Sequence, residues 1–394
     1  MLSLVYRVLS SMHLTVILIT FSILLVFLGT LEQVHIGIHE AQKKYFESFF
    51  VIWKYPPTWY ASSVLFWLSI PLPGGFSLGG TLVLNLTISH FRYFKSSWKN
   101  LGISITHFGV LLLLISGFAV SFYQRESIMS IEKGKSKNYS ESFYNHEIAL
   151  IDKSDPMKDQ VYSISSDSLE SGNAISDPSL PLSIEIKQYH PHAVFGSREK
   201  NPNATSIKAN RGLGAQQKLV FFPKQPSYAE DHINWPTAIV SLWDKDKKLG
   251  TWLISSFLDQ GFPPQTFTHQ GKTYQITLRS QRFYEPYEIY LDDIAHDKYP
   301  GTEIAKNFSS NIRIQNKDLG VNRKALVYMN HPLRYEGLTY YQHQMDSNKG
   351  VTVFQVVRNP SWLLPYLSVA LVGVGLVLQF SSHLFRFGRR RKVL

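Results

Sequence analysis

The sequence contains no cysteine in its 394 residues. Disulfide bridges, thiolate metal sites, cysteine nucleophiles and CxxC motifs are therefore excluded from this chain. A glycine-rich phosphate loop, an HExxH motif and a GxSxG motif are also missing. Two histidine pairs, His190 with His192 and His35 with His39, lack a third ligand at a fitting spacing and give only a weak metal signal. We expect no catalytic constellation formed by this chain alone.

Acidic residues are also scarce, 29 against 40 basic ones, which gives a formal net charge of +11. The basic residues do not form one soluble surface but flank apolar runs, with Arg92, Lys95 and Lys99 in one loop and a cluster after residue 383. Lysine and arginine concentrate on the cytoplasmic side of membrane spans. The charge therefore indicates membrane topology and gives no reason to expect nucleic acid as a partner.

Long hydrophobic runs are present and define the organisation. The length of each run is close to the ~17 to 25 residues that a helix needs to cross a bilayer. The runs extend over about residues 13–30, 74–91, 101–122 and 361–383. The first run is too long, and lacks the small-residue cleavage site, for a signal peptide. We therefore predict an integral membrane protein with four transmembrane α-helices.

The segment around "IPLPGGF" leaves two topologies open, because apolar residues both precede and follow its prolines and glycines. If both pieces crossed, the basic loop after residue 91 would lie opposite the N-terminus, against the positive-inside bias. If only the later piece crosses, both termini are cytoplasmic and the aromatic-rich residues 59–70 suit an interfacial segment. We favour the second topology.

The domain organisation follows from that topology. We expect a membrane region, 1–122, with three spans and an outer loop, 31–73. A large extracytoplasmic domain, 123–360, a fourth span, 361–383, and a basic cytoplasmic tail, 384–394, complete the chain. The expected location is a bacterial plasma membrane, with a thylakoid membrane as the alternative.

Residues 123–360 show strand patterns. Alternating or β-branched segments are separated by Gly, Pro, Asn and Asp clusters, and they read "HEIALID", "LSIEIKQY", "TAIVSLWD", "TWLISSF", "TYQITLRSQRF", "NIRIQN", "KALVYMN" and "VTVFQVV". No helical period of comparable strength occurs there. We predict a β-rich domain, either a sandwich or an open barrel.

His107 is a titratable residue inside an apolar run, "LGISITHFGVLLLLISGF". At about 1.5 Å per residue it lies about 9 Å from the cytoplasmic end of its helix. His90 closes the preceding run, and the short loop between the runs predicts antiparallel neighbours with both imidazoles in the inner half of the membrane. Such residues usually face a bundle interior or cavity. From the residues alone, His107 fits an iron ligand and an interhelical hydrogen-bonding group equally well. For His90, a solvated histidine at the membrane interface is the simpler interpretation.

One stretch of the predicted outer domain is more particular than a generic strand. "YMNHPLRYEGLTYYQHQM" surrounds Arg334 with Tyr335, Tyr340 and Tyr341. Arginine on aromatic faces serves either packing or partner recognition. These four residues are candidate partner contacts, with a sheet core rimmed by tyrosine hydroxyls as the alternative.

Together, several segments resemble the ResB family of cytochrome c maturation proteins. They are "IPLPGGFSLGGTLVLNLTISHF", "LGISITHFGVLLLLISGF" followed by "IMSIEKGKS", "HDKYPGTEIAKNFSSNIRI", and "NHPLRYEGLTYYQ" leading into "VTVFQVVRNP" and the last run. The resemblance implies a membrane subunit that helps a CcsA-type partner to carry haem outward, keep it reduced and join it to apocytochrome c. It also implies a transient haem b shared with that partner, with His107 as the best match for an axial ligand and His90 as its neighbour, and no other metal.

The partner's tryptophan-rich haem-handling segment is absent here, so the resemblance implies one half of a synthetase, a non-catalytic or co-catalytic subunit. A thioredoxin-like thiol reductant is a further candidate partner. The rival hypothesis is a non-enzymatic scaffold or apocytochrome chaperone that stabilises the CcsA-type protein without binding haem.

Overall fold

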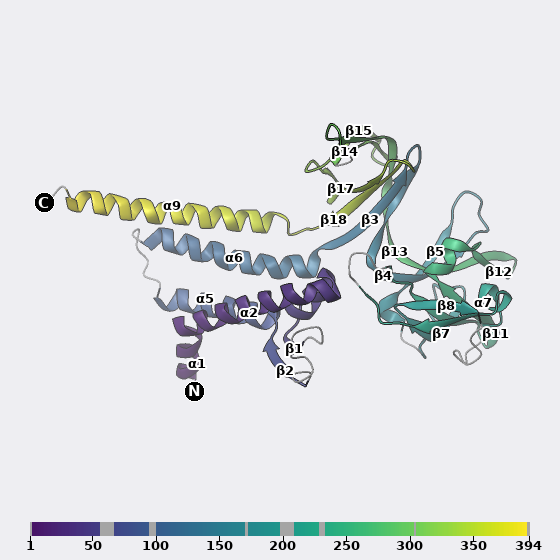
Figure 1. The fold of residues 1–394 in the computed structure, drawn as a ribbon, viewed down its shortest axis with the longest axis horizontal. Helices are drawn as coiled ribbons and strands as arrows, with labels where there is room; N and C mark the ends of the chain where they lie inside the picture. Colours follow the sequence, from purple (N-terminus) through teal and green to yellow (C-terminus); the bar gives the residue numbers. More distant parts are fainter. Residues whose placement is uncertain are drawn as a thin grey trace. The chain divides into compact units, whose positions relative to one another are not determined.

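The computed structural model describes residues 2–55, 67–93, 100–169, 172–197, 209–227, 233–302 and 305–391. The chain divides into two units. Met1–Arg125 and Asn359–Leu394 form the helical unit, and Glu126–Ser227 and His232–Arg358 form the β unit. Figure 1 shows their elements, and each unit is described by itself.

The helical unit contains four long helices: α2 (Met12–Ile36), α5 (Gly75–Tyr93), α6 (Leu101–Tyr123) and α9 (Leu363–Arg391). Among the described residues, three stretches are long and apolar enough to cross a membrane, Met12–Ile36, Leu101–Tyr123 and Leu363–Gly388. The shorter α5 is not among them, so a fourth span remains a prediction. A short helix, α1 (Leu2–Leu9), precedes α2, and Ser11 caps α2 by accepting a hydrogen bond from the backbone N–H of His13.

The loop after α2 is folded. It contains α3 (Ile38–Ala41), a π-helical turn η1 (Gln42–Phe46) and an antiparallel hairpin of β1 (Phe50–Lys54) with β2 (Ser69–Pro73). The segment "PLPGG" ends β2 and begins α5, so the described end of the first apolar piece is a strand and the second piece is a helix. A Cβ on Gly74 or Gly75 would collide with the carbonyl oxygen of Ser48 or Phe46, and glycine is therefore required there. Of the interfacial segment predicted at 59–70, residues 59–66 lie outside the described residues and residues 69 and 70 belong to β2.

Helices α6 and α9 lie side by side (Figure 1), and small residues let their backbones approach closely. A Cβ on Gly102 would lie 2.7 Å from the backbone nitrogen of Gln379, and one on Gly109 would lie 2.8 Å from that of Val372. The two glycines are seven residues apart, as are Ser368 and Gly375 on α9. A seven-residue repeat keeps one seam facing a partner helix, which explains the long contact. Helix α9 continues to Arg391, so the predicted basic tail is largely a helical extension.

The β unit is built on one large sheet, a smaller second sheet and a two-stranded pair. The large sheet has the order β15-β14-β13-β4-β3-β18-β17-β16, with β12 added to β13 and β5 added to β4. Its strands are β3 (Arg125–Glu132), β4 (Ser136–Asp152), β5 (Gln160–Ser165), β12 (Gln265–His269), β13 (Lys272–Lys298), β14 (Ala305–Asn316), β15 (Val321–Tyr328), β16 (Leu333–Tyr335), β17 (Leu338–Asp346) and β18 (Val351–Arg358).

A second sheet has the order β11-β10-β7-β6, and β8 pairs with β9. These strands are β6 (Ala174–Ile175), β7 (Ser183–His190), β8 (Ala193–Ser197), β9 (Leu219–Pro223), β10 (Thr237–Asp244) and β11 (Lys247–Ser255), and short helices α7 (Gly212–Gln216) and α8 (Ser256–Gly261) flank them. Each of the eight predicted strand segments overlaps a strand, which confirms the β-rich domain, although "TWLISSF" runs into α8 and "KALVYMN" into a turn.

Both predicted architectures are present, because the large sheet takes part in two cores. In one core it faces the second sheet, and side chains such as Ile148 and Ile276 pack against Ile184 and Val240 as in a sandwich. In the other it curls on itself into a nearly closed barrel. There Ser310 of β14 donates to Gln342 of β17 at 2.7 Å, so that strands from the two ends of the sheet meet. Buried residues of this second core include Met129, Ile312, Tyr340 and Phe354.

Candidate functional site

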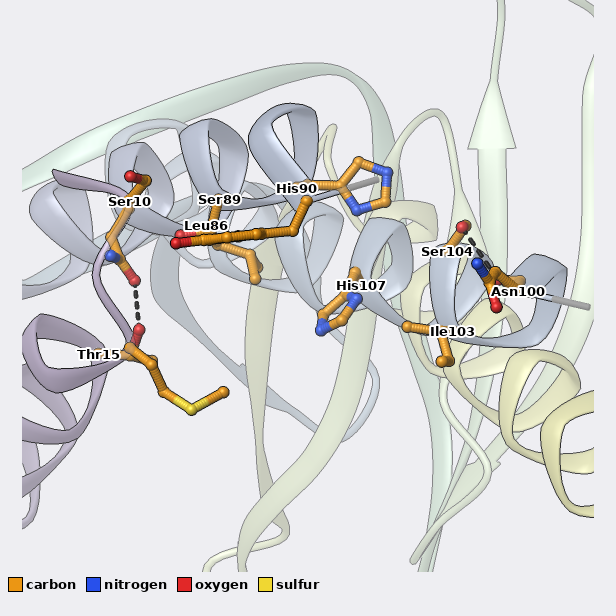
Figure 2. Close-up of a pocket in the computed structure, with 12 residues that line it drawn as sticks. Ser10, Thr15, Leu86, Ser89, His90, Asn100, Ile103, Ser104 and His107 are labelled. Atoms are coloured by element: carbon orange, nitrogen blue, oxygen red, sulfur yellow. Dashed lines mark hydrogen bonds between the residues drawn. The ribbon is translucent and has the colours of Figure 1, made fainter. Parts of the chain in front are cut away.

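The helical unit contains a cavity of about 430 Å³ between the α1–α2 junction, α5 and α6. Cavities of roughly 300–1,000 Å³ are typical of small-molecule sites. Figure 2 shows its lining, made by Ser10, Met12, Thr15, Asn85, Leu86, Ser89, His90, Tyr93, Asn100, Ile103, Ser104 and His107. Both histidines predicted from the sequence therefore lie in one cavity.

Helical spacing explains why these residues share a wall. On α6 the lining positions are separated by three or four residues, from Asn100 through Ile103 and Ser104 to His107, so they lie on one face. On α5 the lining runs from Asn85 to Tyr93 with the same spacing. The short connection between these helices brings the two faces together, as expected for antiparallel neighbours.

The imidazoles of His90 and His107 are close neighbours across this wall. Their ring centroids lie 5.9 Å apart with an angle of 65° between the planes, and Figure 2 shows them on facing turns of α5 and α6. His107 also lies close to the backbone of Ile103, one turn earlier on its own helix. An imidazole in a cavity wall can present a ring nitrogen to a bound metal.

Asn85, on the same helix as His90, fixes the part of the cavity wall formed by the α1–α2 junction, although the sequence analysis did not select it. Its side chain is 1% exposed and donates to the carbonyl oxygens of Leu9 at 2.7 Å and Ser11 at 3.2 Å. Thr15 completes the set by donating to the Asn85 carbonyl at 2.6 Å. These bonds satisfy the backbone where α1 ends and α2 begins, and they hold that break against α5. The available signal was an amide in the apolar segment "LVLNLTIS".

The donor set of the cavity suits a metal that arrives with most of its ligands already attached. The described residues contain no group of three or more His, Asp or Glu that could hold a bare metal ion. A porphyrin supplies four nitrogens to its iron and needs only one or two axial ligands from protein, for which histidine is common. Among the described lining residues there is no carboxylate, and Met12, Leu86 and Ile103 add apolar surface. These residues therefore fit haem better than a hydrated cation.

The four predicted partner contacts occupy different environments in the barrel. Tyr340 is completely buried, and its hydroxyl bonds that of Tyr287 at 2.8 Å. Tyr335 is half-buried, with its ring 4.8 Å from the ring of Tyr287. Arg334 and Tyr341 are exposed on the outer face of the barrel. Arg334 lies opposite Thr339 of β17, and side chains alternate along that strand, so Arg334 and Tyr341 share this face. Arg334 and Tyr341 therefore stay available as contacts, whereas Tyr340 belongs to the core.

A second cleft, of about 540 Å³, lies on the β unit and is lined by charged residues including Asp259, Arg279 and Arg282. Burial raises the pKa of Asp259 to about 6, against the lowering effect of a hydrogen bond from Thr277 and of the two arginines. Both arginines are already paired, with Glu147 and Glu141 at 2.9 Å each. The charges of this cleft thus balance internally, and a structural ion-pair network accounts for them.

The remaining histidines of interest in the β unit have structural contacts. His192 accepts a hydrogen bond from the backbone N–H of Trp235 at 2.9 Å, and His331 stacks on Tyr328 with ring centroids 4.6 Å apart. The ring of His190 packs beside that of Phe221 at 5.6 Å. Neither His190 nor His192 belongs to a metal cluster within the part of the chain that the structure describes.

Comparison with known proteins supports the resemblance. Residues 259–353 match the model of the ResB-like family, a stretch that runs from α8 to β18 in the β unit. Protein NrfI of Wolinella succinogenes is 24% identical to this chain over 102 residues, which are 26% of this chain and 11% of NrfI. The match thus spans about a tenth of the length of that relative. The likeness to the ResB family is confirmed over this segment of the β unit, and the histidine cavity lies outside it.

Proposed function

We propose, with the ResB-like match of residues 259–353 as the premise, that this chain is a membrane subunit of a cytochrome c biogenesis complex and binds haem as cargo between α5 and α6. In this proposal it acts beside a CcsA-type protein, which would take over the haem and attach it to apocytochrome c. In this proposal α2, α6 and α9 span the membrane, α5 is a fourth, shorter span, and the β unit lies outside.

The observation that carries the haem proposal is the pair of imidazoles, 5.9 Å apart, in the wall of one cavity. Two histidines on facing helices can both reach one iron, or one can ligate while the other supports it. We assign the axial ligand to His107, which lines the cavity and is the best match for the ligand position that the family resemblance implies. His90 then neighbours the iron, and a histidine of the partner would supply the opposite ligand. The protein's task is to bind and orient the haem and to keep water from its iron.

The test is co-expression of this chain with a CcsA-type subunit, followed by purification and measurement of the haem Soret band. We expect His107→Ala to lose most of the haem and to abolish cytochrome c maturation. Exogenous imidazole should restore part of the Soret absorbance by occupying the vacated ligand position. His13→Ala is the matched control, because His13 is an exposed histidine on α2 outside the cavity lining.

A second function, a scaffold or apocytochrome chaperone without haem, is favoured by one observation: the family match is confined to the β unit. That function requires the same purified complex to assemble with a normal Soret band when His107 or His90 is replaced. It also requires maturation to fail when the exposed Arg334 and Tyr341 are replaced together. Normal haem content in His107→Ala would exclude His107 as the ligand and leave the scaffold as the better description.

A further inference from the structure

Arg92 lies near the end of α5, at the rim of the histidine cavity. Its guanidinium donates a hydrogen bond to the hydroxyl of Ser10, a fully buried residue of the cavity lining. The guanidinium carbon lies 5.1 Å from the ring centroid of Tyr93, which also lines the cavity, and 5.5 Å from that of Tyr6 on α1. Three contacts therefore hold this cation against the wall.

The charge of Arg92 has no carboxylate counterpart in the part of the chain that the structure describes. Its described partners are a hydroxyl and two aromatic rings. The described lining of the cavity likewise contains no Asp or Glu. A guanidinium can donate five hydrogen bonds, and the bond to Ser10 uses one. The rim therefore offers donors for an anion beside a cavity whose wall carries two imidazoles.

These features define the chemistry of the ligand. The imidazoles suit a metal centre, the apolar side chains suit a flat hydrophobic body, and a guanidinium is suited to bidentate contact with a carboxylate. A porphyrin with carboxylate side chains combines all three. A lipid phosphate could also pair with Arg92, but it would make no use of the histidines.

We propose that Arg92 binds the carboxylates of the haem propionates and so fixes which edge of the porphyrin faces the α1–α2 junction. This inference rests on the proposed haem-binding function and deepens it. Arg92 is a specificity-determining residue in this view: it selects a porphyrin that carries free carboxylates and orients that porphyrin for ligation by His107.

The experiment uses the purified full-length chain in lipid nanodiscs and three probes: haem, haem dimethyl ester and metal-free protoporphyrin IX. A hydrogen bond to a charged group is worth about tenfold or more in affinity. We expect the wild-type chain to prefer haem over its ester by at least that factor. Arg92→Gln should bind the two alike without a change in the Soret maximum of the ligated form, and Arg92→Lys should keep part of the preference.

Arg7→Gln is the matched control, because Arg7 is an exposed cation on α1 outside the cavity lining, and it should leave the preference intact. Equal binding of haem and ester by the wild-type chain would overturn the inference. An equal loss of both ligands in Arg92→Gln would also overturn it, since that result indicates a structural or lipid-binding role. Protoporphyrin IX lacks iron and cannot be ligated by histidine. The effect of Arg92→Gln on the affinity for protoporphyrin IX therefore tests this inference even if His107→Ala shows that the ligand assignment is wrong.

Discussion

The carboxylate of Glu147 on β4 accepts a hydrogen bond from the Nε of Arg279 on β13 at 2.9 Å, with the two side chains 3% and 11% exposed. Ser163 of β5 adds a second hydrogen bond to this carboxylate at 2.5 Å. One charge pair thus joins three adjacent strands on the face of the large sheet that lines the charged cleft, opposite the sandwich core. Burial of ions is costly, so such a pair persists only where geometry and further hydrogen bonds compensate.

Glu147→Ala should lower the free energy of unfolding by about 3 kcal/mol, because it leaves the largely buried Arg279 without its carboxylate, although the hydrogen bond to the Tyr284 hydroxyl at 3.3 Å remains. The measurement is chemical denaturation of the full-length chain in detergent, followed by tryptophan fluorescence. Glu132→Ala is the control, since the ion pair of Glu132 with Lys135 is exposed and is screened by solvent, so its loss should change stability little. Equal destabilisation by the two variants would contradict the prediction.

His146 should make the β unit sensitive to mild acid. Burial lowers the pKa of His146 to about 4 from an ordinary value of 6.5. Well above pH 6.5 the imidazole is neutral in the folded and in the unfolded state, so it does not lower the free energy of unfolding. Between pH 6.5 and 4 only the unfolded state takes up the proton, so stability falls as pH falls, by about 3 kcal/mol in all. We expect His146→Leu to flatten this part of the profile when unfolding free energy is measured against pH. Parallel profiles for the two proteins would show that His146 does not control this range.

Gly109 should be irreplaceable in the contact of α6 with α9. A Cβ there would meet backbone atoms of α9, the Val372 nitrogen at 2.8 Å and the Ser368 oxygen at 3.0 Å. Gly109→Val should therefore separate the helices and lower the melting temperature in detergent by several degrees, as overpacking costs typically about 1–3 kcal/mol. Gly117→Val, on the same helix with open space at its Cβ position, is the control and should melt as the wild type does. Equal melting temperatures of the two variants would contradict the close contact of α6 with α9.

Tyr340 and Tyr341 should respond differently to loss of a hydroxyl. Tyr340→Phe leaves the buried hydroxyl of Tyr287 without its 2.8 Å partner, at a cost of about 1–3 kcal/mol. Tyr341→Phe should leave the unfolding free energy unchanged, because that side chain is exposed. Thermal unfolding of the two variants makes the comparison. A stable Tyr340→Phe together with a destabilised Tyr341→Phe would reverse the assignment of the two faces of β17.

The sequence predicts the helices and most strands because each is fixed by local periodicity. The segment "TAIVSLWD" is β-branched and continuously apolar, and β10 is indeed buried along Thr237–Leu242. The length of β13 was not predictable. Its register shifts opposite β4 and β14 let one strand turn from the sandwich into the barrel, and those shifts depend on the partner strands.

The candidate site was likewise predictable only where local spacing along the sequence determines it. The spacing of His90 and His107 and the short loop between their helices were enough to pair them. An amide in an apolar segment was a signal for Asn85, but the roles of Asn85 and Arg92 could not be predicted, because they depend on a break near Ser10 that returns the first two helices to α5. Contacts made across more than seventy residues leave no periodic trace in the sequence.

Strand β13 is a wall of both cores of the β unit, with Tyr274, Ile276 and Leu278 in one and Tyr287, Ile289 and Leu291 in the other. A break in the hydrogen bonding of this strand therefore exposes apolar surface on both sides of the break at once. We therefore expect the sandwich and the barrel to unfold together, so that the unit is either wholly folded or wholly open to proteases.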